Sequence, residues 1–211
     1  MKRLLFAAIA MSIMLALSGC GDGSSNPPSV FVSQILSSPT LDGDIELNSA
    51  NVLTVTQGNV PSVFAGIDPV TGSEFRAFLF FPLTGANGVP GNAIIESATL
   101  DIFIDNISIL PAASSIPIRI ELVSFSPPTL LASDYDLPAL AVTTIIPPIS
   151  RIDIGSNVSV DVTSLMVEAQ RRGLANFQIR ILEDFGFVFP GLIEIDDLII
   201  NRAPLLTVTY F

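Results

Sequence analysis

The sequence predicts an all-β sandwich or barrel with one short helix, and three observations lead to this fold class. Apolar and polar residues alternate with a period of two over many short stretches. Clusters of Pro, Gly, Asn and Ser separate these stretches, as turns separate strands. A single stretch, near residue 165, has the apolar spacing of an amphipathic helix instead. The sequence therefore predicts strands that each bury one face in a common core.

The residues FRAFLFFP at 75–82 form a predicted strand whose two faces are both apolar. Phe78 and Phe80 share one face with Arg76, and the opposite face is wholly apolar. A strand of this kind is central and has its outer side covered by a helix or by loops. An exposed aromatic binding face is the alternative, but Phe side chains are preferentially buried.

Five later stretches alternate with a period of two and predict half-buried strands. They lie at 98–105, 118–122, 158–162, 177–181 and 206–210. Tyr210, on the last of them, is expected in the core. Pairs of prolines at 127–128 and 147–148 mark loops between strands.

The predicted helix follows the strand at 158–162. Thr163 or Ser164 is suited to cap its N-terminus, and Gly173 is suited to end it. Arg171 and Arg172 occupy the last turn, where positive charge interacts favourably with the helix dipole.

The first 19 residues have the layout of a secretory signal. Lys2 and Arg3 precede an apolar run that is shorter than the roughly 20 residues of a membrane-spanning helix. The residues LSGC at 17–20 resemble the lipobox of bacterial lipoproteins. This resemblance implies that Cys20, the single cysteine, is lipidated and becomes the new N-terminus. The alternative is an ordinary signal peptide with a stray cysteine.

The lipidated cysteine and a flexible tether occupy residues 20–28, and a single folded domain follows at 29–211. In lipoproteins, an aspartate directly after the lipidated cysteine tends to hold the protein at the inner membrane. Here that position is Gly21. The resemblance therefore implies a bacterial envelope protein that is anchored in the outer membrane by its lipid.

The composition excludes most familiar chemistry. Without the signal, seven arginines face 20 acidic residues, a net charge of about −13, so nucleic acid is not an expected partner. That mature chain has no lysine, histidine or tryptophan. The usual zinc sites, Ser-His-Asp triads and Schiff-base lysines are thereby excluded. We expect the protein not to be an enzyme.

Blocks of sequence in a defined order resemble a known family. They are RAFLFFPL (76–83), IESATLDIFI (95–104), VDVTSLMVEAQRRG (160–173), FQIRIL (177–182) and RAPLLTVTYF (202–211). Their order is similar to that of the DNRLRE-type domain, which is grouped with carbohydrate-binding module family 96. The resemblance implies a jelly-roll β-sandwich that is displayed outside the cytoplasm and binds carbohydrate.

Aromatic side chains are the first candidates for a sugar site, because flat rings pack against pyranoses. Tyr135, between Asp134 and Asp136 in a polar loop, offers both a ring and a hydroxyl. A second set alternates along one short stretch and forms either an exposed platform or part of the core: Phe185, Phe187 and Phe189.

Two groups of carboxylates are candidates for calcium. Asp42, Asp44 and Glu46 lie near the start of the domain, and Asp196 and Asp197 lie near its end. Because the chain ends can meet in a sandwich, these side chains are candidates to converge on one ion, together with backbone carbonyls. A solvated acidic surface is the alternative.

We expect a non-catalytic envelope lipoprotein whose module binds a polysaccharide or another envelope component. The negative charge favours a neutral glycan unless calcium bridges an acidic one. The alternative is a structural or adhesive envelope protein that acts by self-assembly or protein contact, without glycan binding. A carbohydrate-active enzyme with two catalytic carboxylates is a more distant possibility.

Overall fold

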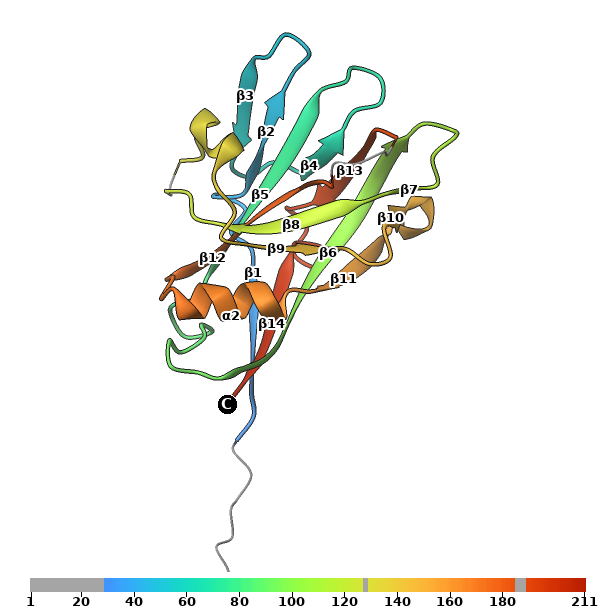
Figure 1. Cartoon of the computed structure of the whole chain (residues 1–211). Helices are drawn as coiled ribbons and strands as arrows, with labels where there is room; N and C mark the ends of the chain where they lie inside the picture. The colour runs from blue at the N-terminus through green and yellow to red at the C-terminus, as the bar shows by residue number, and fades with distance from the viewer. Residues whose placement is uncertain (1–28, 127–128, 185–188) are drawn as a thin grey trace, which may run out of the picture.

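Two long strands, β5 (Glu74–Pro82) and β6 (Ile95–Ile109), organise the structure. The computed structural model describes residues 29–126, 129–184 and 189–211, so the predicted signal and tether lie outside the described residues. Around the two long strands an antiparallel sheet curls into a sandwich (Figure 1), in the order β1-β14-β6-β13-β4-β5-β12-β8-β9. The predicted all-β sandwich with one short helix is confirmed.

The remaining elements follow the chain in short segments. The strands are β1 (Phe31–Leu36), β2 (Gly43–Leu47), β3 (Leu53–Gln57), β4 (Ser62–Ile67), β7 (Ser115–Ile116), β8 (Ile118–Val123), β9 (Ala141–Thr144), β10 (Ile149–Ser150), β11 (Ser156–Asp161), β12 (Asn176–Glu183), β13 (Gly191–Asp196) and β14 (Leu205–Tyr210). The helices are η1 (Ala132–Asp136), η2 (Arg151–Asp153) and α2 (Thr163–Arg171), of which η1 and η2 are 3-10 helices.

The period-two pattern places one face of each strand in the main core. On β6, Ala98, Leu100, Ile102 and Ile104 are all buried, as the alternation predicts. The main core cluster runs from Ile35 to Val208. In the described residues, strands from the start and from the end of the chain therefore share one core.

The strand with two apolar faces, β5, is central, as predicted. Its second face carries Phe78 and Phe80 into a smaller cluster with Phe125, Leu130 and Tyr135. The segment around η1 supplies these covering side chains. This burial explains why both faces of the strand are apolar.

Helix α2 packs on β6 and β9 through Leu165, Met166 and Ala169. Its predicted cap is wrong, because the N-cap residue is Val162, whose side chain makes no capping hydrogen bond. The hydroxyl of Thr163 instead accepts a hydrogen bond from the Ala98 amide of β6, at 2.9 Å. A contact to the sheet thus replaces the local cap.

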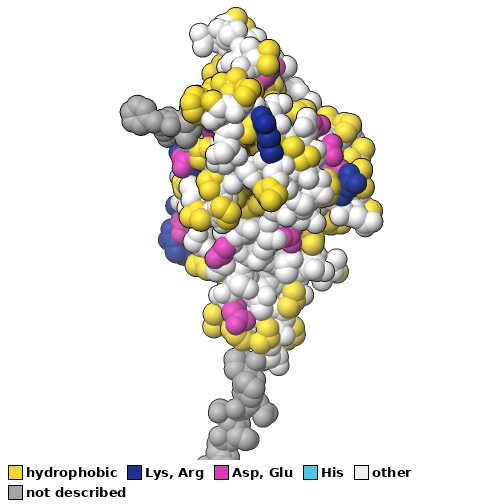
Figure 2. All heavy atoms as spheres, turned by 90° about the vertical axis from the view of Figure 1, so that its right-hand side faces the viewer, with side chains coloured by type: hydrophobic (Ala, Val, Ile, Leu, Met, Phe, Trp, Pro, Cys, Tyr) yellow, Lys and Arg dark blue, Asp and Glu magenta, His cyan; other side chains and the backbone are white. Residues whose placement is uncertain are grey.

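The first and last strands, β1 and β14, pair along their whole lengths, so both ends of the domain lie at the same narrow end (Figure 1). Figure 2 shows this narrow end at the bottom of the view, where apolar side chains gather with few charged ones among them. In the described residues, no helix has the length and hydropathy needed to cross a membrane.

Candidate functional site

Two aromatic side chains lie together where β1 and β14 pair. Phe31 faces Tyr210 across these strands, and their rings stack with centroids 5.8 Å apart and 25° between the planes. The Phe31 side chain is 54% exposed, whereas Tyr210 packs partly against the core, where the sequence placed it. The pairing of β1 with β14 thus holds an exposed aromatic ring at the edge of the sheet.

A hollow of about 700 Å³ opens beside this pair, between the edge strand β1 and the loop after β5. We call it the aromatic hollow. Its lining contains no charged side chain and consists of Phe31, Val32, Ser33, Gln34, Ala86, Asn87, Gly88 and Tyr210. Gln34 and Asn87 are exposed and also line an adjoining hollow of about 250 Å³. Their amides offer both donors and acceptors to a ligand.

Hydrogen bonds hold the two walls of the aromatic hollow in place. The Ser33 hydroxyl donates to the Gly88 carbonyl at 3.1 Å and lies 3.4 Å from the Tyr210 hydroxyl. The Val89 amide donates to the Leu83 carbonyl at 2.9 Å and closes the loop. A Cβ atom at position 88 would lie 2.2 Å from the Leu83 carbonyl oxygen, so this turn requires glycine. The shape of the hollow is therefore built into the fold.

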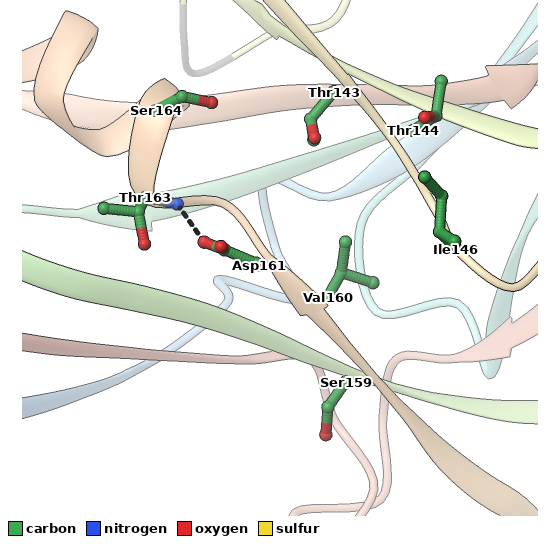
Figure 3. A pocket seen from close by; sticks show the side chains of 8 residues that line it. All are labelled: Thr143, Thr144, Ile146, Ser159, Val160, Asp161, Thr163 and Ser164. Atoms are coloured by element: carbon green, nitrogen blue, oxygen red, sulfur yellow. Dashed lines mark hydrogen bonds between the residues drawn. The ribbon is translucent and has the colours of Figure 1, made fainter.

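A second depression, of about 540 Å³, has a different character (Figure 3). We call it the hydroxyl groove, because Thr143, Thr144, Ser159, Thr163 and Ser164 line it. These residues belong to β9 on one side and to β11 and the start of α2 on the other. The lining includes no aromatic ring, so the groove offers hydrogen bonds without a flat apolar surface.

The carboxylate of Asp161 also lines the hydroxyl groove. It accepts a hydrogen bond from the Thr163 amide at 2.9 Å, drawn as a dashed line in Figure 3. Hydrogen bonds from Thr163, first from its side chain and then from its backbone, lower the pKa of Asp161. The groove thus carries a fixed negative charge at neutral pH.

Tyr135, the best sugar-binding candidate from the sequence, is not available to a ligand, because only 4% of it is exposed. The Arg76 guanidinium lies 3.7 Å from the centroid of its ring, and burial raises the pKa of the phenol. Its backbone carbonyl accepts hydrogen bonds from both Arg76 and Arg180, each at 2.6 Å. Two arginines of the sheet thus turn the expected binding loop into a covering for β5.

The neighbours of Tyr135 have separate roles. The Asp134 carboxylate accepts a hydrogen bond from the Leu131 amide at 2.8 Å and stabilises the start of η1. Asp136 is exposed and pairs with Arg76 at 3.1 Å.

Of the three alternating phenylalanines, Phe189 is 54% exposed. Phe185 and Phe187 lie outside the described residues. The predicted platform therefore remains a prediction.

The five predicted calcium ligands separate into a pair and three others. Asp42 and Asp197 meet in the interior, where each influences the charge of the other. Asp44 accepts a hydrogen bond from the Phe64 amide at 3.3 Å, and burial raises its pKa to about 7. Asp196 accepts hydrogen bonds from the amides of the turn after β13, and Glu46 is half-buried on β2.

In the part of the chain that the structure describes, no three or more Asp, Glu, His or Cys side chains form a metal-binding group. A calcium site of the predicted five carboxylates is therefore not assembled. What the structure does bring together is the pair from opposite ends of the domain.

Sequence reasoning missed Phe31, Gln34 and Asn87. FVSQIL at 31–36 does not alternate apolar and polar residues with a period of two, so it carries only a weak strand signal. No local pattern indicates that this first strand pairs with the last one. The aromatic hollow depends on that pairing.

Comparison of the sequence with known protein families and with curated proteins finds no match. The functional argument therefore relies on the geometry of these surfaces and on the sequence patterns.

Proposed function

We propose that this chain is a non-catalytic, lipid-anchored protein of a bacterial envelope whose sandwich binds a neutral glycan at the aromatic hollow. The stacked pair of Phe31 and Tyr210 beside the amides of Gln34 and Asn87 carries this proposal. Aromatic rings pack against the apolar faces of pyranoses, and a few polar groups fix the orientation of the sugar.

The charge of the molecule supports a neutral ligand. No charged side chain lines the aromatic hollow, so nothing there compensates the charge of an acidic sugar. The mature chain carries about −13 overall and repels polyanions.

Two sequence features support the location and the ligand class. The LSGC lipobox and the position of Cys20 support lipid anchoring, and Gly21 after it supports the outer membrane. The order of blocks that resembles the DNRLRE-type domain supports carbohydrate as the ligand.

The placement of the carboxyl groups supports a non-catalytic role. Glycosidases need two carboxyl groups that reach the scissile bond. Asp42 and Asp197, which meet in the structure, are both fully buried and are therefore out of reach of a polysaccharide.

The test is binding of residues 29–211 to a panel of neutral and acidic polysaccharides. We expect retention on a neutral glycan and a roughly tenfold or greater loss of affinity for Phe31→Ala, because the exposed ring is removed. Ile152→Ala is the control, since Ile152 is an exposed apolar residue that does not line the aromatic hollow. Failure of the folded domain to bind any glycan would overturn the proposal. Loss of binding for Thr143→Val alone would move the site to the hydroxyl groove.

One observation favours a second candidate function, self-assembly. Among the described strands, β1 pairs with β14 alone, and its edge is apolar, with Val32 61% and Leu36 42% exposed. Such an edge offers unpaired backbone groups to another chain. Light scattering after size exclusion separates the two functions. Monomers favour the glycan module, whereas large species that Val32→Lys disperses favour assembly.

A further inference from the structure

Three side chains from opposite ends of the domain meet inside the protein. Ser37 directly follows β1, Asp42 directly precedes β2, and Asp197 directly follows β13. The two aspartates are fully buried, and Ser37 is 5% exposed. The Ser37 hydroxyl adjoins both carboxyl groups.

The backbone around these side chains is fixed by hydrogen bonds. The Ser37 amide donates to the Pro204 carbonyl at 2.9 Å, and the Asp197 amide donates to the Pro61 carbonyl at 3.0 Å. One carboxylate oxygen of Asp42 accepts a hydrogen bond from the Phe80 amide at 2.6 Å. The cluster is thus held by three segments that lie far apart in the sequence.

Apart from contacts within the cluster itself, four of its buried oxygen atoms have no hydrogen-bond partner among the described residues. They are Oγ of Ser37, Oδ2 of Asp42, and Oδ1 and Oδ2 of Asp197. Buried polar atoms without partners are costly and uncommon in folded proteins. Their convergence at one place points to a bound cation that these oxygen atoms would coordinate.

No arginine compensates the two carboxyl groups within the described segments. The ion pairs there involve other carboxylates, and Arg202 reaches Asp196 at 3.7 Å rather than Asp197. Burial, followed by the charge of Asp197, raises the pKa of Asp42 to about 9. One shared proton would neutralise one carboxylate and leave the other charge buried.

We propose that Ser37, Asp42 and Asp197 bind one calcium ion, which connects a segment near the start of the domain with one near its end. A divalent cation neutralises both carboxylates and gives every free oxygen a partner. Calcium takes roughly six to eight oxygen ligands in flexible geometry, so the ion would need main-chain carbonyls or water besides these side chains. Magnesium sheds its water reluctantly and suits such a closed site less well. This site uses Ser37 and omits Asp44, Glu46 and Asp196.

The test uses the full chain, purified in detergent and stripped with a chelator. We expect calorimetric titration with CaCl₂ to give one site. At a calcium concentration a hundred times the dissociation constant, we expect the melting temperature to rise by about 5–10 °C.

The isosteric variants Asp42→Asn and Asp197→Asn should fold and lose the calcium response. In chelator they should melt no lower than the unsubstituted protein, because each removes a buried like charge. Asp196→Asn, at the neighbouring position, is the matched control and should keep the response.

Three results would overturn the proposal. The first is no calcium-dependent shift in the folded, unsubstituted chain, which would leave a shared proton as the occupant. The second is an equal shift with magnesium. The third is a calcium shift that both aspartate variants retain. None of these results depends on glycan binding.

Discussion

Glu183 shows how one buried carboxyl group connects separate strands. It is fully buried at the end of β12, and its Oε2 accepts hydrogen bonds from the amides of Ile67 at 3.2 Å and Gly191 at 3.4 Å. Burial is the main cause that raises its pKa to about 7, against an ordinary value of 4.5. The folded protein therefore holds a proton there that the unfolded chain releases.

This proton makes stability depend on pH. Between about pH 4.5 and pH 7 the unfolded chain binds fewer protons than the folded one, so the free energy of unfolding falls as the pH rises. We expect Glu183 to account for a fall of about 1–3 kcal/mol. Urea denaturation in chelator at pH 5 and pH 8 measures it as the difference between the unsubstituted protein and Glu183→Gln. Asp44, with a raised pKa of its own, contributes in the same direction to both proteins.

Glu96→Gln is the control for this measurement, because Glu96 is exposed. An unchanged pH dependence in Glu183→Gln would contradict the assignment of the proton to Glu183.

At the scale of elements, α2 closes one side of the main core. Its buried face carries Leu165, Met166 and Ala169, while Val167 is 46% exposed. Glu168 pairs with Arg171 and Arg172 on the helix surface. Such exposed pairs contribute little, so the packed face of the helix provides most of its stability.

Truncation of this face should be costly. Leu165→Ala leaves a cavity in the core, and we expect the free energy of unfolding to fall by about 2–5 kcal/mol. Urea denaturation measures the change. Val167→Ala, on the same helix, should change it by about 0.5 kcal/mol or less. Equal effects of the two substitutions would contradict the role of α2 as a cover for the core.

At the scale of the whole molecule, the aromatic hollow and the start of the domain lie at the same end, because Phe31 opens β1. Residues 20–28 span at most roughly 30 Å when fully extended. If Cys20 is lipidated, as we propose, the hollow stays near the membrane. The glycans within its reach are then those close to the membrane surface.

Lipid anchoring predicts a specific effect of Cys20→Ser in the full chain expressed in a bacterium. We expect the unsubstituted chain to incorporate labelled palmitate and to sediment with membranes, and Cys20→Ser to lose the label, because no other cysteine exists. Ser24→Ala, in the tether, should behave like the unsubstituted chain. An unsubstituted chain without label would contradict the anchor.

The strands and the helix were predictable because their signals are local. The direction of a side chain along a strand has a period of two, so β6 shows its buried face in its own residues. The same reasoning identified β5 as covered on both sides. Its outer face carries Phe78 and Phe80, and phenylalanine side chains are preferentially buried.

Contacts between distant segments decided the sites. The polar residues around Tyr135 predicted an exposed loop, but Arg76 and Arg180 hold Tyr135 against the sheet. The meeting of Asp42 with Asp197 followed from the idea that chain ends join in a sandwich, but no pattern marked Ser37 as their neighbour. The sequence by itself determined which residues form strands and which of their faces are buried, because these depend on neighbours along the chain. Only the tertiary structure decided which strands pair and which polar groups meet, because pairing depends on the packing of the whole core.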